Sequence, residues 1–89
     1  MDLNGATWMV RQLEQPVSMV HLDEHHGVFA GGWDGRLTHW DEAGEHVWTA
    51  QTNDRISALA LNEDVAVVAS GLHVVALDRA TGEERWSMA

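Results

Sequence analysis

The sequence predicts an all-β chain built from two copies of a small four-stranded antiparallel sheet, and three observations support this. First, the stretch ALDRATGEERW at 76–86 closely resembles THWDEAGEHVW at 38–48. Second, short runs rich in valine, leucine, isoleucine and alanine alternate with turn-forming residues, as strands joined by hairpins require. Third, no stretch carries apolar residues at the 3.6-residue period of an amphipathic helix.

The repeat extends over most of the chain. Glycine and tryptophan recur at a spacing of 38 residues, in the pairs Gly44–Gly82 and Trp48–Trp86. Ala30 and Ala69 are 39 residues apart, so small gaps in the turns are needed to align the two units.

The start of the chain echoes the same motif, because Asp2, Gly5 and Trp8 repeat the order of Asp, Gly and Trp at 41–48. We therefore predict that residues 1–16 hold a strand equivalent to the last strand of a preceding unit. The first complete unit is assigned to 17–52 and the second to 53–89. This surplus strand would compete for a sheet edge if copies of the chain assembled side by side.

Each strand is bounded by turn signals. In the second unit the predicted strands are RISALAL, VAVVAS, HVVALD and EERWSM, separated by NED, GL and RATG. In the first unit the separators are DEHHG, GGWDG and EAG. The dipeptide Asp34-Gly35 is a hairpin signal, because glycine accepts the positive φ angle that such a turn needs.

The alternation within VAVVAS predicts a sheet that is covered on both faces. Apolar or small side chains occupy both sides of this strand, at Val65, Val67 and Ala69 on one side and Ala66, Val68 and Ser70 on the other. A sheet with one solvated face would alternate more cleanly between apolar and polar residues. Small four-stranded sheets packed between copies of themselves are the blades of a β-propeller.

The second unit resembles the repeats of the PQQ-like β-propeller family, in which Leu-Asp ends a strand, Thr-Gly follows in a tight turn and Trp ends the next strand. The matching residues are Ala76, Leu77, Asp78, Thr81, Gly82 and Trp86. The first unit departs from this pattern, because Trp40 replaces the leucine, the turn is one residue shorter and no threonine precedes Gly44. A WD-repeat propeller is the close alternative, although its histidine and Trp-Asp pairs are not at their usual places.

The repeated motif has a structural explanation at every position. The two glycines are expected to adopt positive φ at the corner between the third and fourth strands, and the two aspartates to cap that corner through backbone amides. The two tryptophans are expected to wedge between adjacent sheets. These structural residues are Asp41, Gly44, Trp48, Asp78, Gly82 and Trp86.

Composition excludes several classes of function. Fourteen acidic residues face five arginines and no lysine, for a net charge of −9, which disfavours nucleic acid and anionic membranes as partners. Such a composition fits either a salt-adapted protein or a genome that favours arginine codons. Cysteine is absent, no apolar run reaches the roughly 20 residues of a membrane span, and no signal peptide is visible, so we expect a cytoplasmic protein.

Two blades alone would leave apolar sheet faces uncovered, whereas propellers close with about four to eight blades. The predicted function is therefore a noncatalytic scaffold or interaction module without a cofactor, closed into a ring by three or four copies of the chain. The alternative is a piece of a larger propeller, such as a quinone- or metal-dependent oxidoreductase. The resemblance to PQQ-dependent dehydrogenases would imply a quinone and a calcium ion on the ring axis, but their linked cysteine pair is missing here.

No catalytic residues are predicted, because no nucleophile elbow or phosphate-binding loop is present. Two weaker candidates for binding remain. His25, His26 and Asp23 in the turn DEHHG offer nitrogen and oxygen donors to a metal ion, although a pair of histidines in a turn is normally just solvated. Trp33 and Asp34 in the turn GGWDG are the first candidates for contact with a ligand, and the competing explanation is that Trp33 packs on the adjacent blade.

Overall fold

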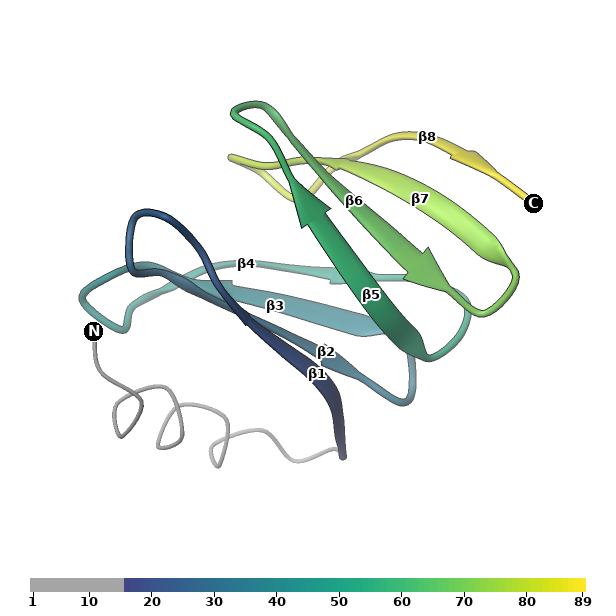
Figure 1. The fold of residues 1–89 in the computed structure, drawn as a ribbon, viewed down its shortest axis with the longest axis horizontal. Coiled ribbons are helices and arrows are strands. Elements are labelled where there is room, and N and C mark those ends of the chain that lie inside the picture. The colour runs from purple at the N-terminus through teal and green to yellow at the C-terminus, as the bar shows by residue number, and fades with distance from the viewer. Residues whose placement is uncertain (1–15) are drawn as a thin grey trace.

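The computed structural model describes residues 16–89, which form eight β-strands in two separate four-stranded sheets (Figure 1). Blade 1 consists of β1 (Val17–Leu22), β2 (Val28–Gly32), β3 (Arg36–Trp40) and β4 (His46–Gln51). Blade 2 consists of β5 (Ile56–Leu61), β6 (Val65–Ser70), β7 (His73–Asp78) and β8 (Glu84–Met88). No helix long and apolar enough to span a membrane occurs in this described part of the chain.

Each blade is an antiparallel meander in which every strand pairs with the next along the sequence. The prediction of an all-β fold with two four-stranded antiparallel sheets is therefore confirmed. The four strands predicted for the second unit agree with β5 to β8 to within one residue. The surplus strand predicted near the N-terminus falls on residues 1–15, which lie outside the described residues.

The alignment of Ala30 with Ala69 is wrong by one residue. Ala30 pairs with Val20 on β1, whereas the residue at the corresponding place in blade 2 is Val68, which pairs with Leu59 on β5. Because neighbouring residues of a strand point to opposite faces, this slip would exchange the two faces of β2. Aligning the two repeats by sequence matched one alanine with another. The hydrogen-bonded pairing of the strands determines which residues of the two blades are equivalent.

The corrected register shows where the two blades differ. The offset between equivalent residues is 39 for β1 and β5, 38 for β2 and β6, 37 for β3 and β7, and 38 again for β4 and β8. Blade 1 therefore has one extra residue in each of its first two turns and one fewer in its third. All the differences in length between the two blades lie in the turns, so equivalent strands pair with their neighbours in the same way in both blades.

The hydrophobic core lies between the blades. Its members are Phe29, Leu37 and Trp48 from blade 1 and Ile56, Ala66, Val68, Val75 and Leu77 from blade 2. The two sheets approach closely at Gly31, where an added Cβ would lie 2.7 Å from Cγ2 of Ile56. Glycine is required at that position because any side chain would hold the first strand of blade 2 away from blade 1.

Candidate functional site

The repeated turn between the third and fourth strands of each blade has the predicted construction. In each turn the aspartate Oδ1 accepts two backbone amides at 2.9–3.2 Å: Asp41 from Ala43 and Glu45, and Asp78 from Ala80 and Thr81. The glycines that follow have φ angles of 82° at Gly44 and 79° at Gly82. These are positive values that glycine adopts at little cost, so the predicted roles of the Asp and Gly residues are confirmed.

Trp48 joins the two blades through this turn. Its indole Nε1 donates a hydrogen bond of 2.8 Å to the backbone oxygen of Arg79, and only 5% of the residue is exposed. A Cβ on Gly82 would lie 2.7 Å from the indole ring, so the ring rests directly on the glycine. The tryptophan of blade 1 therefore packs on the β7–β8 turn of blade 2.

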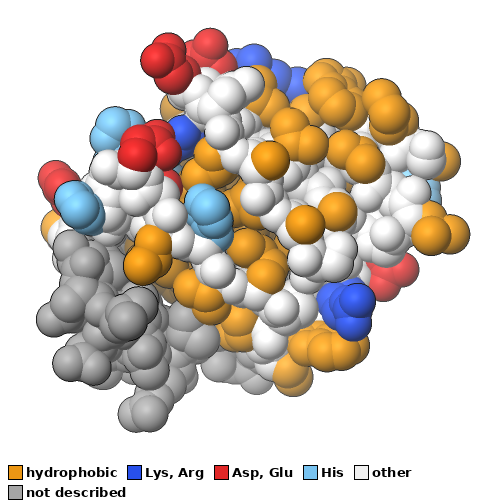
Figure 2. Space-filling model, in the orientation of Figure 1, with side chains coloured by type: hydrophobic (Ala, Val, Ile, Leu, Met, Phe, Trp, Pro, Cys, Tyr) orange, Lys and Arg blue, Asp and Glu red, His pale blue; other side chains and the backbone are white. Residues whose placement is uncertain are grey.

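Trp86 occupies the equivalent position in blade 2 but is only partly covered. It pairs with Ala76 as Trp48 pairs with His39, yet 45% of it is exposed. Met88, two residues along the same face of β8, is 56% exposed. Figure 2 shows hydrophobic side chains gathered over the part of the molecule that blade 2 forms. The prediction that Trp86 wedges between sheets therefore requires a further sheet beyond residues 16–89.

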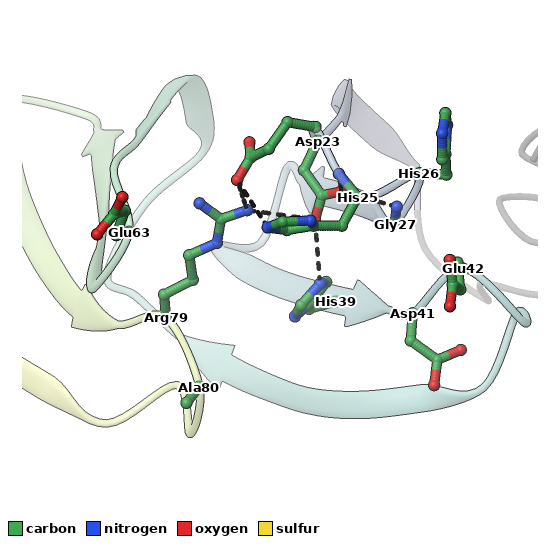
Figure 3. Close-up of a pocket in the computed structure, with 11 residues that line it drawn as sticks. Asp23, His25, His26, Gly27, His39, Asp41, Glu42, Glu63, Arg79 and Ala80 are labelled. Carbon is green, nitrogen blue, oxygen red and sulfur yellow. Dashed lines mark hydrogen bonds and ion pairs between the residues drawn. The ribbon is translucent and has the colours of Figure 1, made fainter.

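The second candidate site is a hollow of about 830 Å³ where the turns of the two blades meet at one end of the molecule (Figure 3). A group of charged and polar side chains lies there at the boundary between the blades. Asp23 and Glu24 come from the β1–β2 turn, His39 from β3, and Arg79 from the β7–β8 turn. The first three belong to blade 1 and the arginine to blade 2.

Asp23 is the buried centre of this group. Its Oδ1 accepts hydrogen bonds from the amides of His25 and Gly27, both at 2.8 Å. Its Oδ2 lies 3.5 Å from Arg79 Nη2 and 3.7 Å from His39 Nε2. Burial acts to raise the pKa of Asp23, but the two amides and the neighbouring cationic groups outweigh it and lower the pKa from 3.8. The carboxylate is therefore charged at neutral pH.

Arg79 connects the blades electrostatically. Its Nη2 lies 2.6 Å from Glu24 Oε1, and its Nη1 donates a hydrogen bond of 2.6 Å to the backbone oxygen of Asn62 in its own blade. The side chains of Arg79 and Asp23 are 10% and 4% exposed, so this pair is screened by solvent less than a surface pair would be, whereas Glu24 is 57% exposed.

His39 lies between the charged group and the core. Its ring stacks on Phe29 with centroids 3.9 Å apart and meets the edge of Trp48 at 5.5 Å. Its Nδ1 is buried and has no hydrogen-bond partner among the described residues. Burial lowers the pKa of His39 below 6.5, and the opposing effect of the Asp23 carboxylate is too small to reverse it.

Because the folded state disfavours the charged form of His39, acid should weaken the fold. In the unfolded chain the ring binds a proton near pH 6.5, whereas in the folded chain it does so only at lower pH. We expect the free energy of unfolding to fall as pH decreases from 6.5, by at most about 1.4 kcal/mol per pH unit from this group. Urea unfolding of the wild type and of His39→Phe between pH 5 and 7.5 tests this, and equal losses in both proteins would contradict it.

The structure does not gather the predicted metal ligands. Asp23 is engaged by backbone amides and by Arg79, while the ring of His25 lies 3.3 Å from Glu24. His26 has a φ of 65° and is drawn apart from Asp23 in Figure 3. Among residues 16–89, no three histidine, aspartate or glutamate side chains are grouped as metal ligands would be.

Trp33 lies at the opposite end of the blades, in the β2–β3 turn. Its ring is 4.7 Å from the guanidinium carbon of Arg55, which precedes β5, and 55% of the residue is exposed. Asp34 accepts the amide of Arg36 at 3.1 Å. Trp33 thus contacts the adjacent blade and also borders a small pocket of about 360 Å³ with Ser57. Ligand binding by this loop stays a prediction.

Sequence reasoning missed Glu24, His39 and Arg79 as a group. They are separated by up to 55 positions, and no spacing in the sequence connects them. The available signal was Arg79 itself, since it is one of only five arginines in an acidic chain and follows directly after the conspicuous Asp78.

Comparison with solved structures shows a propeller-type fold. BamB from Moraxella catarrhalis, a β-propeller, superposes with a TM-score of 0.77 at 20% identity, over 85% of this chain and 25% of that one. The computationally designed Ika8 protein superposes with a TM-score of 0.68 at 19% identity, over 81% of this chain and 23% of that one. No protein-family profile and no curated protein sequence matches the chain. The chain spans about a quarter of the length of each of these two structures.

Proposed function

We propose that this chain is a pair of PQQ-like propeller blades that acts as a noncatalytic scaffold or interaction module and closes into a ring with copies of itself. The contrast between Trp48 and Trp86 carries this proposal. One tryptophan is seated on the following blade and is 5% exposed, and its counterpart is 45% exposed on a sheet that nothing in the described chain follows. An apolar face of this kind is typical of an interaction surface.

Among the possible assemblies we propose the eight-bladed ring first. Two blades of this chain account for a quarter of BamB and for 23% of Ika8. Four such spans would complete a ring of that size, which corresponds to four copies of this chain and eight blades. Three copies, giving six blades, are the other closed arrangement within the usual range.

The charged group at the blade boundary supports a structural role. Asp23 accepts two backbone amides of the β1–β2 turn and forms an ion pair with Arg79 of the other blade. These contacts occupy its carboxylate, which makes it a poor candidate for a general base. A quinone- or metal-dependent oxidoreductase is the alternative function, and no specific contact among residues 16–89 favours it. The net charge of −9 continues to disfavour nucleic acid and anionic lipid as partners.

The mass of the assembly tests this proposal. We expect light scattering at high salt to give one discrete species of three or four chains, with four favoured. Screening of the negative charge should make this species more stable at about 1 M than at about 0.1 M ionic strength. A monomer at every salt and protein concentration, or an open-ended range of sizes, would contradict ring closure by self-assembly.

A further inference from the structure

The contact between the two blades serves as a template for a contact between copies. Within the chain, β4 presents Trp48 to the turn that follows β7, where the ring covers Gly82 and bonds the oxygen of Arg79. On β8, Trp86 has the same register opposite its partner strand as Trp48 has on β4. Among residues 16–89, no turn of this kind lies against Trp86.

The chain carries such a turn on its other blade. The Asp41 amide donates to the oxygen of Glu45, as the Asp78 amide donates to the oxygen of Glu83. Gly44 donates to the oxygen of Asp41 at 3.0 Å and has the positive φ of its counterpart in blade 2. In this turn, Glu42 occupies the position that directly follows the capping aspartate, where blade 2 has Arg79.

From this correspondence we propose that Trp86 of one copy docks on the Asp41–Gly44 turn of the next, and that Glu42 and Glu63 meet across this junction and make it dependent on salt. The inference rests on the self-assembly proposed above and specifies its contacts. The indole of Trp86 would donate to the backbone oxygen of Glu42, as that of Trp48 does to Arg79. The occupant of the open face of blade 2 is thus a second copy of this chain.

The charges at the two kinds of junction differ. Inside the chain, Arg79 of one blade lies between Asp23 and Glu24 of the other. The offset of 39 between β1 and β5 places Asn62 and Glu63 where blade 1 has Asp23 and Glu24. Between copies, Glu42 would take the place of the arginine, so the ion pair is replaced by two carboxylates of like charge.

This difference predicts how the assembly responds to ionic strength. Two exposed carboxylates repel each other, and the repulsion is screened as the Debye length falls from ~10 Å at 0.1 M to ~3 Å at 1 M salt. The contact within the chain is formed by opposite charges, whose attraction is weakened by the same screening. Salt should therefore strengthen the junction between copies without strengthening the junction within a copy.

The decisive experiment compares four proteins by light scattering across protein concentration, at about 0.1 M and about 1 M ionic strength. They are the wild type, Trp86→Ala, Glu42→Arg, and Trp33→Ala as the control. Trp33, which is 55% exposed where Trp86 is 45% exposed, lies at the opposite end of the blades, in a turn that the proposed junction does not use. Circular dichroism of each variant verifies that its sheets are formed.

We expect Trp86→Ala to be monomeric at both salts, while Trp33→Ala assembles like the wild type. Glu42→Arg gives the junction between copies an arginine where the internal junction has Arg79. This variant should assemble at low salt at a protein concentration about fivefold lower than the wild type. If the wild type assembles but Trp86→Ala assembles equally well, or Glu42→Arg leaves the salt dependence unchanged, the docking proposal is overturned and self-assembly stands. If only Glu42→Arg assembles, the docking geometry is supported and native self-assembly is not. Monomers throughout would overturn both.

Discussion

Replacing Trp48 with alanine is expected to destabilise the packing of the two blades by about 3–5 kcal/mol, the usual cost of truncating a buried aromatic side chain. The ring is 5% exposed, meets Phe29 edge-on with centroids 5.8 Å apart, and rests on Gly82. Its removal would leave a cavity and also strip the Arg79 carbonyl of a hydrogen bond from Nε1.

Urea unfolding monitored by circular dichroism would measure this loss, at low salt and low protein concentration so that assembly does not contribute. Trp86→Ala is the matched control, because it deletes the same side chain from the same register position where that side chain is 45% exposed. Its cost should be smaller by about half, since 45% of Trp86 is exposed whereas only 5% of Trp48 is. Equal costs for the two variants would show that Trp48 is not the wedge between blades.

Replacing Asp23 with alanine is expected to cost about 3 kcal/mol at neutral pH. The substitution leaves the buried amide of Gly27 without its acceptor and takes away one of the two carboxylates beside Arg79. Because the pKa of Asp23 is lowered from 3.8, its contribution is complete above that pH and is lost as the pH falls through the folded-state value. The difference between variant and wild type should therefore shrink in strong acid.

Asp41→Ala provides the control for this measurement. Asp41 also accepts the amides of the residues two and four positions ahead, but in an exposed turn and without an ion pair to any of residues 16–89. Its replacement should cost about 1 kcal/mol, the typical net contribution of hydrogen bonds that water can replace. If thermal or urea unfolding gives the same loss for both aspartates, the charged group at the blade boundary does not stabilise the fold.

The sequence was sufficient to predict the strands and turns because their signals are local. Val65, Val67 and Ala69 alternate with apolar partners over one short run, and Asp78 and Gly82 mark one turn, so no distant contact is needed to interpret them. The register was predicted less well, as the slip at Ala30 shows. A gap can be placed in any of several turns without changing the apparent match, and only the hydrogen-bonded ladder distinguishes the choices.

The fold class, the two repeated blades and the roles of Asp41, Gly44, Asp78 and Gly82 in their turns could be predicted from the sequence, because each depends on residues within one repeat. The tertiary structure alone decided which side chains meet across the blades. Arg79 joins Asp23 and Glu24 because stacking brings together turns 55 residues apart, and the same stacking buries one repeated tryptophan and leaves the other open. A repeat makes two residues alike in sequence, whereas burial depends on whether another blade follows in space.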